Sequence, residues 1–330
     1  MASTRREFVG AGLGITAAAA MAQQTGNGVP TRRLGKTNEQ VSILALGGAH
    51  GAGIGRKDPD AALRLMHAAI DEGVTFFDNA WAYGNGFCEE MMGKALQGSR
   101  RQKVFLMTKC SGRDTKFASQ CLEDSLRRLQ TDVIDLWQFH EINWDNDPDW
   151  VYERGGLKVA LDAQEAGKVR HIGFTGHKDP RIHNKMLNTA YDWAAAQLPI
   201  NPLDHYYRSF EGETVPLCLV KDVGMIGMKS LGGADGMIIK HSGLTAEECG
   251  RYALSRPIAT LVRGWTSMDQ LMADVKWARG FQPLSEAEEA RILAKAKPHA
   301  GDGRFEQFKS TQRFDNVLYR KMHQFPGAED

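Results

Sequence analysis

The sequence alternates eight short apolar runs with longer stretches that have helical periodicity. This alternation is typical of a chain in which helices connect parallel strands. Over about 290 residues it favours an α/β fold of the (β/α)8 TIM barrel type, built as a single domain, over an open doubly wound sheet. The apolar runs cover residues 42–46, 75–77, 104–107, 133–139, 169–174, 194–200, 225–228 and 258–262.

Local signals support a helix after several of these runs. Asp58 and Pro59 suit the N-cap and the first position of a helix, and Gly73 suits its end. Leu122 and Leu126 begin a stripe on one face of a later stretch. These stripes predict helices that pack against a central sheet.

The open-sheet alternative would normally carry G-x-G-x-x-G between its first strand and helix. The segment "GAHGAGIGRKDP" has glycines spaced as G-x-G-x-G, and a polar stretch separates them from Pro59. No G-K-[ST] phosphate loop follows any apolar run. The glycines therefore do not support a dinucleotide-binding open sheet.

The composition narrows the possible partners. A formal net charge of +1, without long runs of like charge, predicts no nucleic-acid partner. The five cysteines are scattered and form no C-x-x-C, which predicts core residues rather than a disulfide framework or a zinc ribbon. The oligomeric state is left open.

The first 28 residues are interpreted as a leader. Arg5-Arg6, a weakly apolar Gly/Ala segment and Ala20-Met21-Ala22 resemble a twin-arginine signal peptide. An Ala-rich tail with two chance arginines is the alternative. The interpretation predicts export to the periplasm without a stable membrane anchor after signal removal, or a cytoplasmic protein if the leader is not functional. Residues 29–330 would then form the barrel, with a C-terminal tail from about residue 300.

Three successive apolar runs lead into polar residues. Asp78 and Tyr83 follow the second run, Lys109 ends the third and His140 ends the fourth. In a barrel the carboxyl ends of all strands meet on one face, where active sites lie. We therefore expect these four side chains to lie together.

Each residue alone has a simpler explanation, because a lysine at a strand end is usually solvated and a histidine there is usually packed. A metal-dependent hydrolase would need a third ligand at recognisable spacing to Asp78 and His140, and none is present. We therefore predict no metal site.

Together the four residues suit proton transfer to a carbonyl oxygen. Lys109 would lower the pKa of Tyr83, Asp78 would hold Lys109, and His140 would orient the carbonyl.

The segment "FFDNAWAYG" resembles the F-D-T-A-x-x-Y-G signature of the aldo-keto reductases, with Asn79 in place of threonine. The resemblance covers residues 30 to 295, and includes "DLWQFHE" and "GKVRHIGFTGH". It assigns the family's catalytic Asp, Tyr, Lys and His to Asp78, Tyr83, Lys109 and His140. It implies a (β/α)8 barrel that uses NADPH, with NADH not excluded, to act on a small-molecule carbonyl substrate.

The resemblance also implies cofactor contacts. Thr175-Gly176 stand where the family commonly has Ser-Asn, and His177 could replace the missing amide. Trp265 stands where a basic residue often meets the 2′-phosphate, so Lys276 or Arg279 could supply that contact. The cofactor-binding positions implied are Gly48, Thr175, Gly176, Gln197, Met228, Lys229, Ser230, Leu231, Gly232, Gly264, Thr266, Ser267, Gln270 and Asp274.

Aromatic side chains near the four catalytic positions predict the substrate site. Trp81, Phe87, Trp137 and Trp144 flank these positions and would form an aromatic rim suited to an apolar or planar carbonyl compound, although Trp137 lies within a strand and could equally be a packing residue. The predicted substrate contacts are Trp81, His140 and Trp144. The C-terminal "GRFEQFKSTQRFDNVLYRKM" is a candidate cover for the barrel mouth. The predicted function is NAD(P)H-dependent reduction of an aldehyde or ketone to an alcohol. The alternative is a nicotinamide-binding or redox-sensing barrel without turnover, which would release its cofactor slowly.

Overall fold

The structure is a computed structural model that describes residues 28–50, 54–233, 235–310 and 317–325. The predicted leader, residues 1–28, lies outside these ranges apart from its last residue. Residues 311–316 of the predicted C-terminal tail also lie outside them. Among the described residues, no helix is long and apolar enough to cross a membrane.

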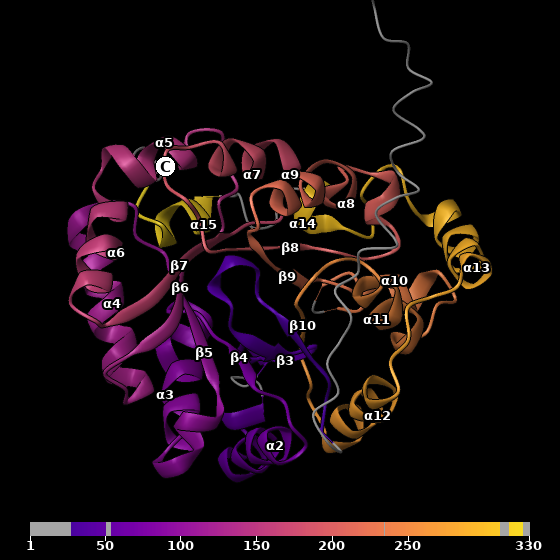
Figure 1. Cartoon of the computed structure of the whole chain (residues 1–330), viewed down its shortest axis with the longest axis horizontal. Helices are drawn as coiled ribbons and strands as arrows, with labels where there is room; N and C mark the ends of the chain where they lie inside the picture. The colour runs from indigo at the N-terminus through magenta and orange to yellow at the C-terminus, as the bar shows by residue number, and fades with distance from the viewer. Residues whose placement is uncertain (1–27, 51–53, 234, 311–316, 326–330) are drawn as a thin grey trace, which may run out of the picture.

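Eight parallel strands form a closed barrel in which β10 pairs with β3 and every other strand pairs with its neighbour in sequence. Helices surround this ring, which Figure 1 shows along the barrel axis. The prediction of a single-domain (β/α)8 barrel is confirmed. The strands are β3 (Leu44–Gly47), β4 (Phe76–Asp78), β5 (Phe105–Cys110), β6 (Ile134–Phe139), β7 (Val169–Thr175), β8 (Ala195–Pro199), β9 (Gly224–Met228) and β10 (Thr260–Arg263).

All eight predicted apolar runs correspond to these strands, with ends that differ by a few residues. The largest difference is in β5, which continues past the apolar run through Lys109 to Cys110. Lys109 pairs with Gln138 in the register of β5 and β6, so the strand places it inside the sheet rather than in a loop. This extension brings the lysine into the barrel mouth.

The helices begin at residues that cap them. Asp58 accepts a hydrogen bond of 2.9 Å from the Ala61 backbone at the start of α2, and Asp114 does the same for α4 from Phe117. The longer helices are α2 (Pro59–Asp71), α3 (Phe87–Ala95), α4 (Thr115–Leu129), α6 (Gly156–Glu165), α7 (Pro180–Leu187), α11 (Ala246–Leu254), α12 (Met268–Arg279) and α13 (Glu286–Ala296). The shorter ones are α5 (Asp147–Glu153), α8 (Phe210–Glu213), α9 (Val215–Val220), α10 (Met237–His241), α14 (Gln307–Ser310) and α15 (Val317–Met322).

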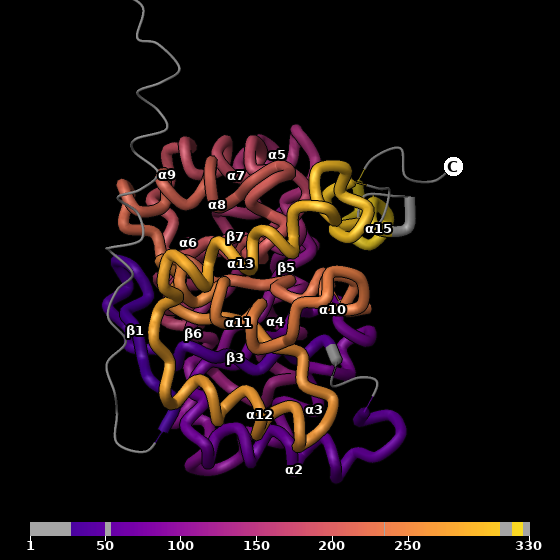
Figure 2. Tube along the Cα trace, turned by 90° about the vertical axis from the view of Figure 1, so that its right-hand side faces the viewer, coloured from indigo at the N-terminus to yellow at the C-terminus, as the bar shows by residue number. Residues whose placement is uncertain are grey.

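A hairpin of β1 (Thr31–Arg33) and β2 (Gln40–Ser42) precedes the barrel. Arg32 is buried and donates hydrogen bonds to the backbone oxygens of Leu254 and Ile258, which fixes the hairpin to the segment before β10. Figure 2 shows β1 at one end of the barrel, and α10 and α15 at the other. The hairpin therefore covers the end opposite the mouth.

The core has two layers. Side chains that point into the barrel, such as Phe76, Met107 and Leu136, form one apolar cluster, and a larger cluster lies between the strands and the helices. All five cysteines are free and buried, as the sequence predicted. The barrel interior is thus packed with apolar side chains below the mouth, and the predicted catalytic side chains of β4 and β5 stand at the carboxyl ends of their strands.

Candidate active site

The four predicted catalytic residues lie together at the carboxyl ends of β4, β5 and β6. Asp78 is the last residue of β4, and Tyr83 begins the short 3-10 helix Tyr83–Gly86 that follows it. This helix turns sharply because Gly84 and Asn85 adopt left-handed conformations, with φ of 59° and 55°. The turn returns the phenol of Tyr83 toward the barrel axis.

Lys109 connects these residues. Its Nζ pairs with the Asp78 carboxylate, donates a 2.7 Å hydrogen bond to the Asn79 backbone oxygen and a 3.3 Å hydrogen bond to the Tyr83 hydroxyl. The Tyr83 and His140 rings lie edge to face, with centroids 5.5 Å apart. One ammonium group thus holds the acid and the phenol in a fixed geometry.

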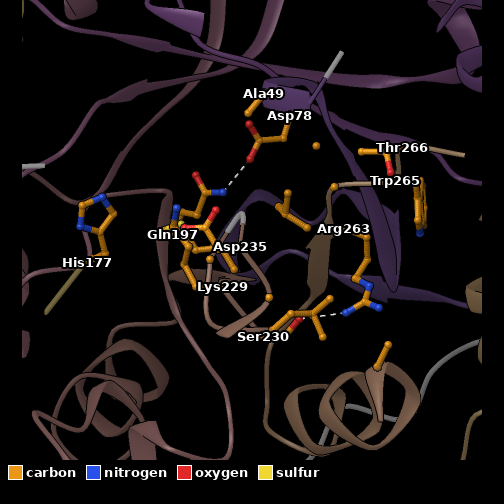
Figure 3. Close-up of a pocket in the computed structure, with 18 of the residues that line it drawn as sticks. Ala49, Asp78, His177, Gln197, Lys229, Ser230, Asp235, Arg263, Trp265 and Thr266 are labelled. Atoms are coloured by element: carbon orange, nitrogen blue, oxygen red, sulfur yellow. Dashed lines mark hydrogen bonds between the residues drawn. The ribbon is translucent and has the colours of Figure 1, made fainter. Parts of the chain in front are cut away.

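Gln197, at β8, reaches the same carboxylate from the other side of the barrel. Its Nε2 donates a 2.6 Å hydrogen bond to Asp78 Oδ2, drawn in Figure 3. Its Oε1 is buried and has no hydrogen-bond partner among the described residues. Because a buried acceptor without a donor is costly, this oxygen is suited to a ligand's N–H group.

Asn79, the departure from the family signature, does not face the cavity. It is fully buried, and its Nδ2 donates a 2.9 Å hydrogen bond to the Cys88 backbone oxygen in α3. Its Oδ1 accepts a hydrogen bond from the Ala80 backbone. Asn79 therefore fixes the loop that carries Tyr83 to the helix behind it.

The expected lowering of the Tyr83 pKa is wrong. Burial raises the pKa of the Tyr83 phenol well above its usual value, and the negative charges of Asp78 and Glu141 raise it further. Burial also lowers the pKa of the Lys109 ammonium, against the opposing charge of Asp78. The site holds Tyr83 as a neutral phenol, which is a proton donor.

His140 is also held neutral. Burial lowers the pKa of its imidazole well below the usual value, although the nearby charge of Glu141 acts in the opposite direction. A neutral imidazole has one donor and one acceptor nitrogen. His140 can therefore orient a carbonyl oxygen by a hydrogen bond without adding a positive charge beside Lys109.

The sequence did not predict Glu141 as a site residue. It follows His140 directly, lines the cavity and is 4% exposed. Burial alone would raise the pKa of its carboxyl, but the histidines at 140, 177 and 323 hold it well below its usual range. The carboxylate after His140 in "FHE" was visible in the sequence, but His177 and His323, which also act on it, come from distant segments.

These residues form one wall of a cavity of about 750 Å³ at the mouth of the barrel. Figure 3 shows His177 on one side of it and Trp265 on the other, with Asp78 and Gln197 between them. Fourteen predicted site residues line the cavity: Asp78, Tyr83, Lys109, His140, Thr175, Gln197, Met228, Lys229, Ser230, Leu231, Gly264, Thr266, Gln270 and Asp274.

Three glycines and a serine that were predicted to touch the cofactor lie just outside the cavity lining. A Cβ at Gly48 would stand 2.8 Å from the Asp78 backbone oxygen, one at Gly176 would stand 2.4 Å from the oxygen of Ile142, and Gly232 has a φ of 84°. These glycines allow the loops to lie close to the strands. Ser267 is the N-cap of α12 and accepts from the Gln270 backbone.

The two predicted substrate tryptophans do not line the cavity. Trp81 turns away from it, donates from Nε1 to Asp124 at 3.1 Å and packs on the ring of Phe117. Trp144 instead packs against the C-terminal segment, with its ring 4.6 Å from that of Phe325. The predicted aromatic rim is therefore absent from the described lining.

Asp274 is fully engaged by protein donors. Its carboxylate accepts from Arg263 Nε and Nη2, at 2.7 and 3.1 Å, and from the indole nitrogens of Trp265 and Trp277, at 2.7 and 3.0 Å. A carboxylate has about four acceptor sites, so none remains for a ligand. Asp274 shapes this wall through its neighbours.

The cations suggested for a phosphate contact are placed elsewhere. Arg279 pairs with Glu72, the residue that follows α2, and Lys276 does not line the cavity. Lys240 of α10 is exposed and lines it. Within the described ranges, no group of three or more His, Cys, Asp and Glu side chains could hold a metal ion.

A closed barrel with a buried Asp–Lys–Tyr arrangement and a neutral histidine at its mouth defines a class of protein, the (β/α)8 barrels with an acid–base site at the carboxyl ends of their strands. Residues 44–242 match the aldo/keto reductase family, and the chain belongs to this family. This membership confirms the family indicated by the sequence.

Similar proteins share parts of this chain. A 6-dehydroglucose reductase of Novosphingobium aromaticivorans is 33% identical over 190 residues, which are 52% of this chain and 60% of that protein. The aldo-keto reductase YhdN of Bacillus subtilis is 31% identical over 197 residues, 56% of this chain and 53% of that protein. The matched part thus spans little more than half the length of each of these two relatives.

Solved structures show the same fold. The holo form of the aldo-keto reductase AKR11C1 from Bacillus halodurans has a TM-score of 0.70 and 24% identity, over 84% of this chain and 99% of its own. An aldo/keto reductase from Klebsiella pneumoniae in complex with NADP and acetate has a TM-score of 0.63 and 21% identity, over 79% of this chain and 93% of its own.

Proposed function

We propose that the protein reduces an aldehyde or ketone to an alcohol with NADPH as cofactor. The observation that carries this proposal is the position of Lys109, which contacts Asp78 and the Tyr83 hydroxyl at the wall of the cavity. The arrangement places a neutral phenol beside an ammonium group in a buried site, where a negative charge on oxygen is strongly stabilised.

The described residues fit a nicotinamide cofactor. Gln197 offers a buried oxygen without a donor, which suits the carboxamide N–H of the nicotinamide, and the Thr175 hydroxyl lies in the same cavity. Lys240 and the loop residues 228–231 line the part of the cavity that would hold the phosphates. NADP in the Klebsiella pneumoniae protein supports NADPH for this chain.

When bound, the reduced nicotinamide supplies the hydride that the carbonyl carbon accepts. The chain supplies the rest. His140 hydrogen-bonds the carbonyl oxygen and sets its direction. Tyr83 then gives its proton to that oxygen, because an alkoxide is a stronger base than a phenolate, and Lys109 stabilises the phenolate that remains. Asp78 keeps Lys109 charged and in place.

The test is the replacement Tyr83→Phe, which removes the proton donor and keeps the ring. We expect kcat for carbonyl reduction to fall by about 10²–10⁴, with NADPH binding, followed by tryptophan fluorescence, nearly unchanged. Tyr152, whose hydroxyl accepts from the Tyr191 backbone away from the cavity, gives the matched control Tyr152→Phe. Equal turnover in the Tyr83 variant and the control would contradict the proposal.

The same measurements separate the alternative function. A binding or sensing barrel would release NADPH slowly and turn over no member of a broad carbonyl panel. An enzyme would exchange the cofactor rapidly and reduce at least one carbonyl. A parallel titration with NADH would decide the cofactor preference.

We also propose that residues 1–28 direct the protein to the periplasm. The support is the sequence alone, in which Arg5-Arg6 precede a weakly apolar segment and Ala20-Met21-Ala22. Replacement of both arginines by lysine should leave the protein in the cytoplasm, as cell fractionation would show. An unchanged distribution would contradict export by the twin-arginine route.

A further inference from the structure

The C-terminal segment places a histidine against the active site. His323 follows α15, is 2% exposed, and its Nε2 lies 2.7 Å from the Glu141 carboxylate. Its Nδ1 lies 3.0 Å from the Ser111 backbone oxygen. Both ring nitrogens face oxygen acceptors. Both contacts are hydrogen bonds only if both nitrogens carry a hydrogen, which makes the ring an imidazolium.

Arg113 fixes the backbone at Glu141, the residue that His323 contacts. Arg113 is buried, donates from Nη2 to the backbone oxygens of His140 and Glu141, at 2.6 and 3.2 Å, and pairs with Asp147 at 3.0 Å. Glu141 has a left-handed backbone, with a φ of 55°. A non-glycine residue keeps such a conformation only where its surroundings enforce it. The loop after β6 is thus built to present this carboxylate.

Aromatic packing holds the segment that carries His323. The ring of Phe325 is buried and lies 4.6 Å from the ring of Trp144 and 4.7 Å from that of Trp150. Arg320 lies over Trp144 at 5.9 Å. The segment around His323 therefore has an apolar contact of its own, separate from the charged pair.

Glu141 adds a second carboxylate to that of Asp78 in this site. Its negative charge acts to raise the pKa values of Tyr83, Lys109 and His140. An uncompensated carboxylate in this buried site would oppose the phenolate that proton donation creates. A cation bound to it removes most of that repulsion. The Nε2 of His323 lies 2.7 Å from one oxygen of this carboxylate, and the Nε2 of His177 lies 3.8 Å from the other.

We propose that His323 is a positioning residue of the active site, whose imidazolium holds and neutralises Glu141 and so sets the charge around Tyr83. The proposal rests on the proposed function for its kinetic consequence, but the charge state of His323 does not depend on it. The C-terminal segment would thus complete the site with a charge rather than only cover it.

Several other groups face this pair and enter any pH dependence. Around His323 and Glu141 these groups are His140, His177 and Arg113, with Asp147 paired to Arg113 and Arg320 over the neighbouring Trp144. Around Tyr83 they are Asp78, Cys88, Lys109, His140, Glu141 and Tyr319.

The charge state is measured first. Nitrogen-15 NMR of the histidine side chains in the full chain should show His323 protonated on both nitrogens near pH 7, with His323→Phe used to assign the signals. Glu141→Gln removes the carboxylate and should convert His323 to a neutral ring. A neutral His323 in the unmodified protein would overturn the proposal, whatever the protein's activity.

The kinetic test is a double-mutant cycle on kcat. Because the two side chains act as a unit, the Glu141→Gln/His323→Phe double variant should depart from the product of the single effects by about threefold or more. The matched control combines Glu141→Gln with Phe325→Leu, which loosens the same segment without touching the charge, and its effects should multiply. A multiplicative result in both cycles would show that His323 only anchors the segment. No turnover of any carbonyl by the unmodified protein would instead sink the proposed function.

Discussion

Gln197 and Asp78 are 119 positions apart in sequence, yet Gln197 Nε2 donates a 2.6 Å hydrogen bond to Asp78 Oδ2. The bond links the residue predicted to grip the nicotinamide with the residue that holds Lys109. Nε2 of this amide is thus bound to Asp78, while its buried Oε1 has no partner among the described residues. Under the proposed function, Gln197 would couple cofactor binding to proton transfer.

Replacement of Gln197 by Met keeps the volume and removes both polar atoms. We expect the Kd for NADPH to rise about tenfold, which is the loss of roughly one hydrogen bond, and kcat to fall as well because Asp78 loses a donor. Fluorescence titration and steady-state kinetics measure the two effects. A change in Kd alone would show that the bond to Asp78 has no part in catalysis.

Removal of one partner from the buried pair of Lys109 and Asp78 should strongly destabilise the folded protein, because the other charge stays buried without a counter-charge. Asp78→Asn leaves an ammonium that is 1% exposed without its counter-charge, so the free energy of unfolding in urea should fall by about 3–5 kcal/mol. Addition of Lys109→Met to this variant should restore part of the loss, because no unpaired charge remains. Additive losses in the double variant would argue against a coupled pair.

Trp81 should affect stability and not substrate choice. Trp81→Phe keeps a ring against Phe117 but loses the bond to Asp124, which should cost about 1 kcal/mol. The ratio of kcat/KM for an aromatic and an aliphatic aldehyde should stay within about twofold of the original. A clear shift in that ratio would restore Trp81 to the substrate site.

The burial of His183 should make the free energy of unfolding fall at acid pH. Burial lowers the pKa of its imidazole from 6.5 to about 3, while its Nε2 lies 3.2 Å from the Gln197 backbone oxygen. The unfolded chain therefore binds a proton below pH 6.5 that the folded protein resists until about pH 3. Stability from this group is complete above pH 6.5 and is lost as the pH falls, by about 2 kcal/mol between pH 6.5 and 5.

The variant His183→Phe, between the rings of Phe174 and Phe210, should show a smaller loss of unfolding free energy between pH 7 and pH 5 than the original protein. Urea unfolding at the two pH values measures this. An identical loss in both proteins would mean that other groups, such as His140 and His177, account for the acid sensitivity.

Much of the geometry of the candidate site could be predicted because it depends on local patterns. Asp78, Lys109 and His140 each end an apolar run, and parallel strands that close into a barrel must bring their carboxyl ends together. Tyr83 joins them through a turn that "YGNG" encodes with residues that tolerate left-handed conformations. None of this required knowledge of distant contacts.

The direction of a side chain at the rim was harder to predict, because it depends on what packs behind it. Trp81 has an acceptor on α4 and turns away from the cavity. Asp274 lines the cavity, but Arg263 and two indoles occupy its carboxylate. The pKa of Tyr83 likewise depends on the number of buried charges around it. The sequence indicated that Lys109 would lie near the phenol of Tyr83. It did not indicate that Glu141 would add a second carboxylate to that of Asp78.

The sequence by itself determined the barrel, because alternating periodicity and helix caps act over a few residues. It also determined which residues stand at the strand ends. Only the tertiary structure decided how these residues are charged and what completes them. His323 meets Glu141 across 182 positions of sequence, and such a contact exists only after the chain has folded and excluded water from both side chains.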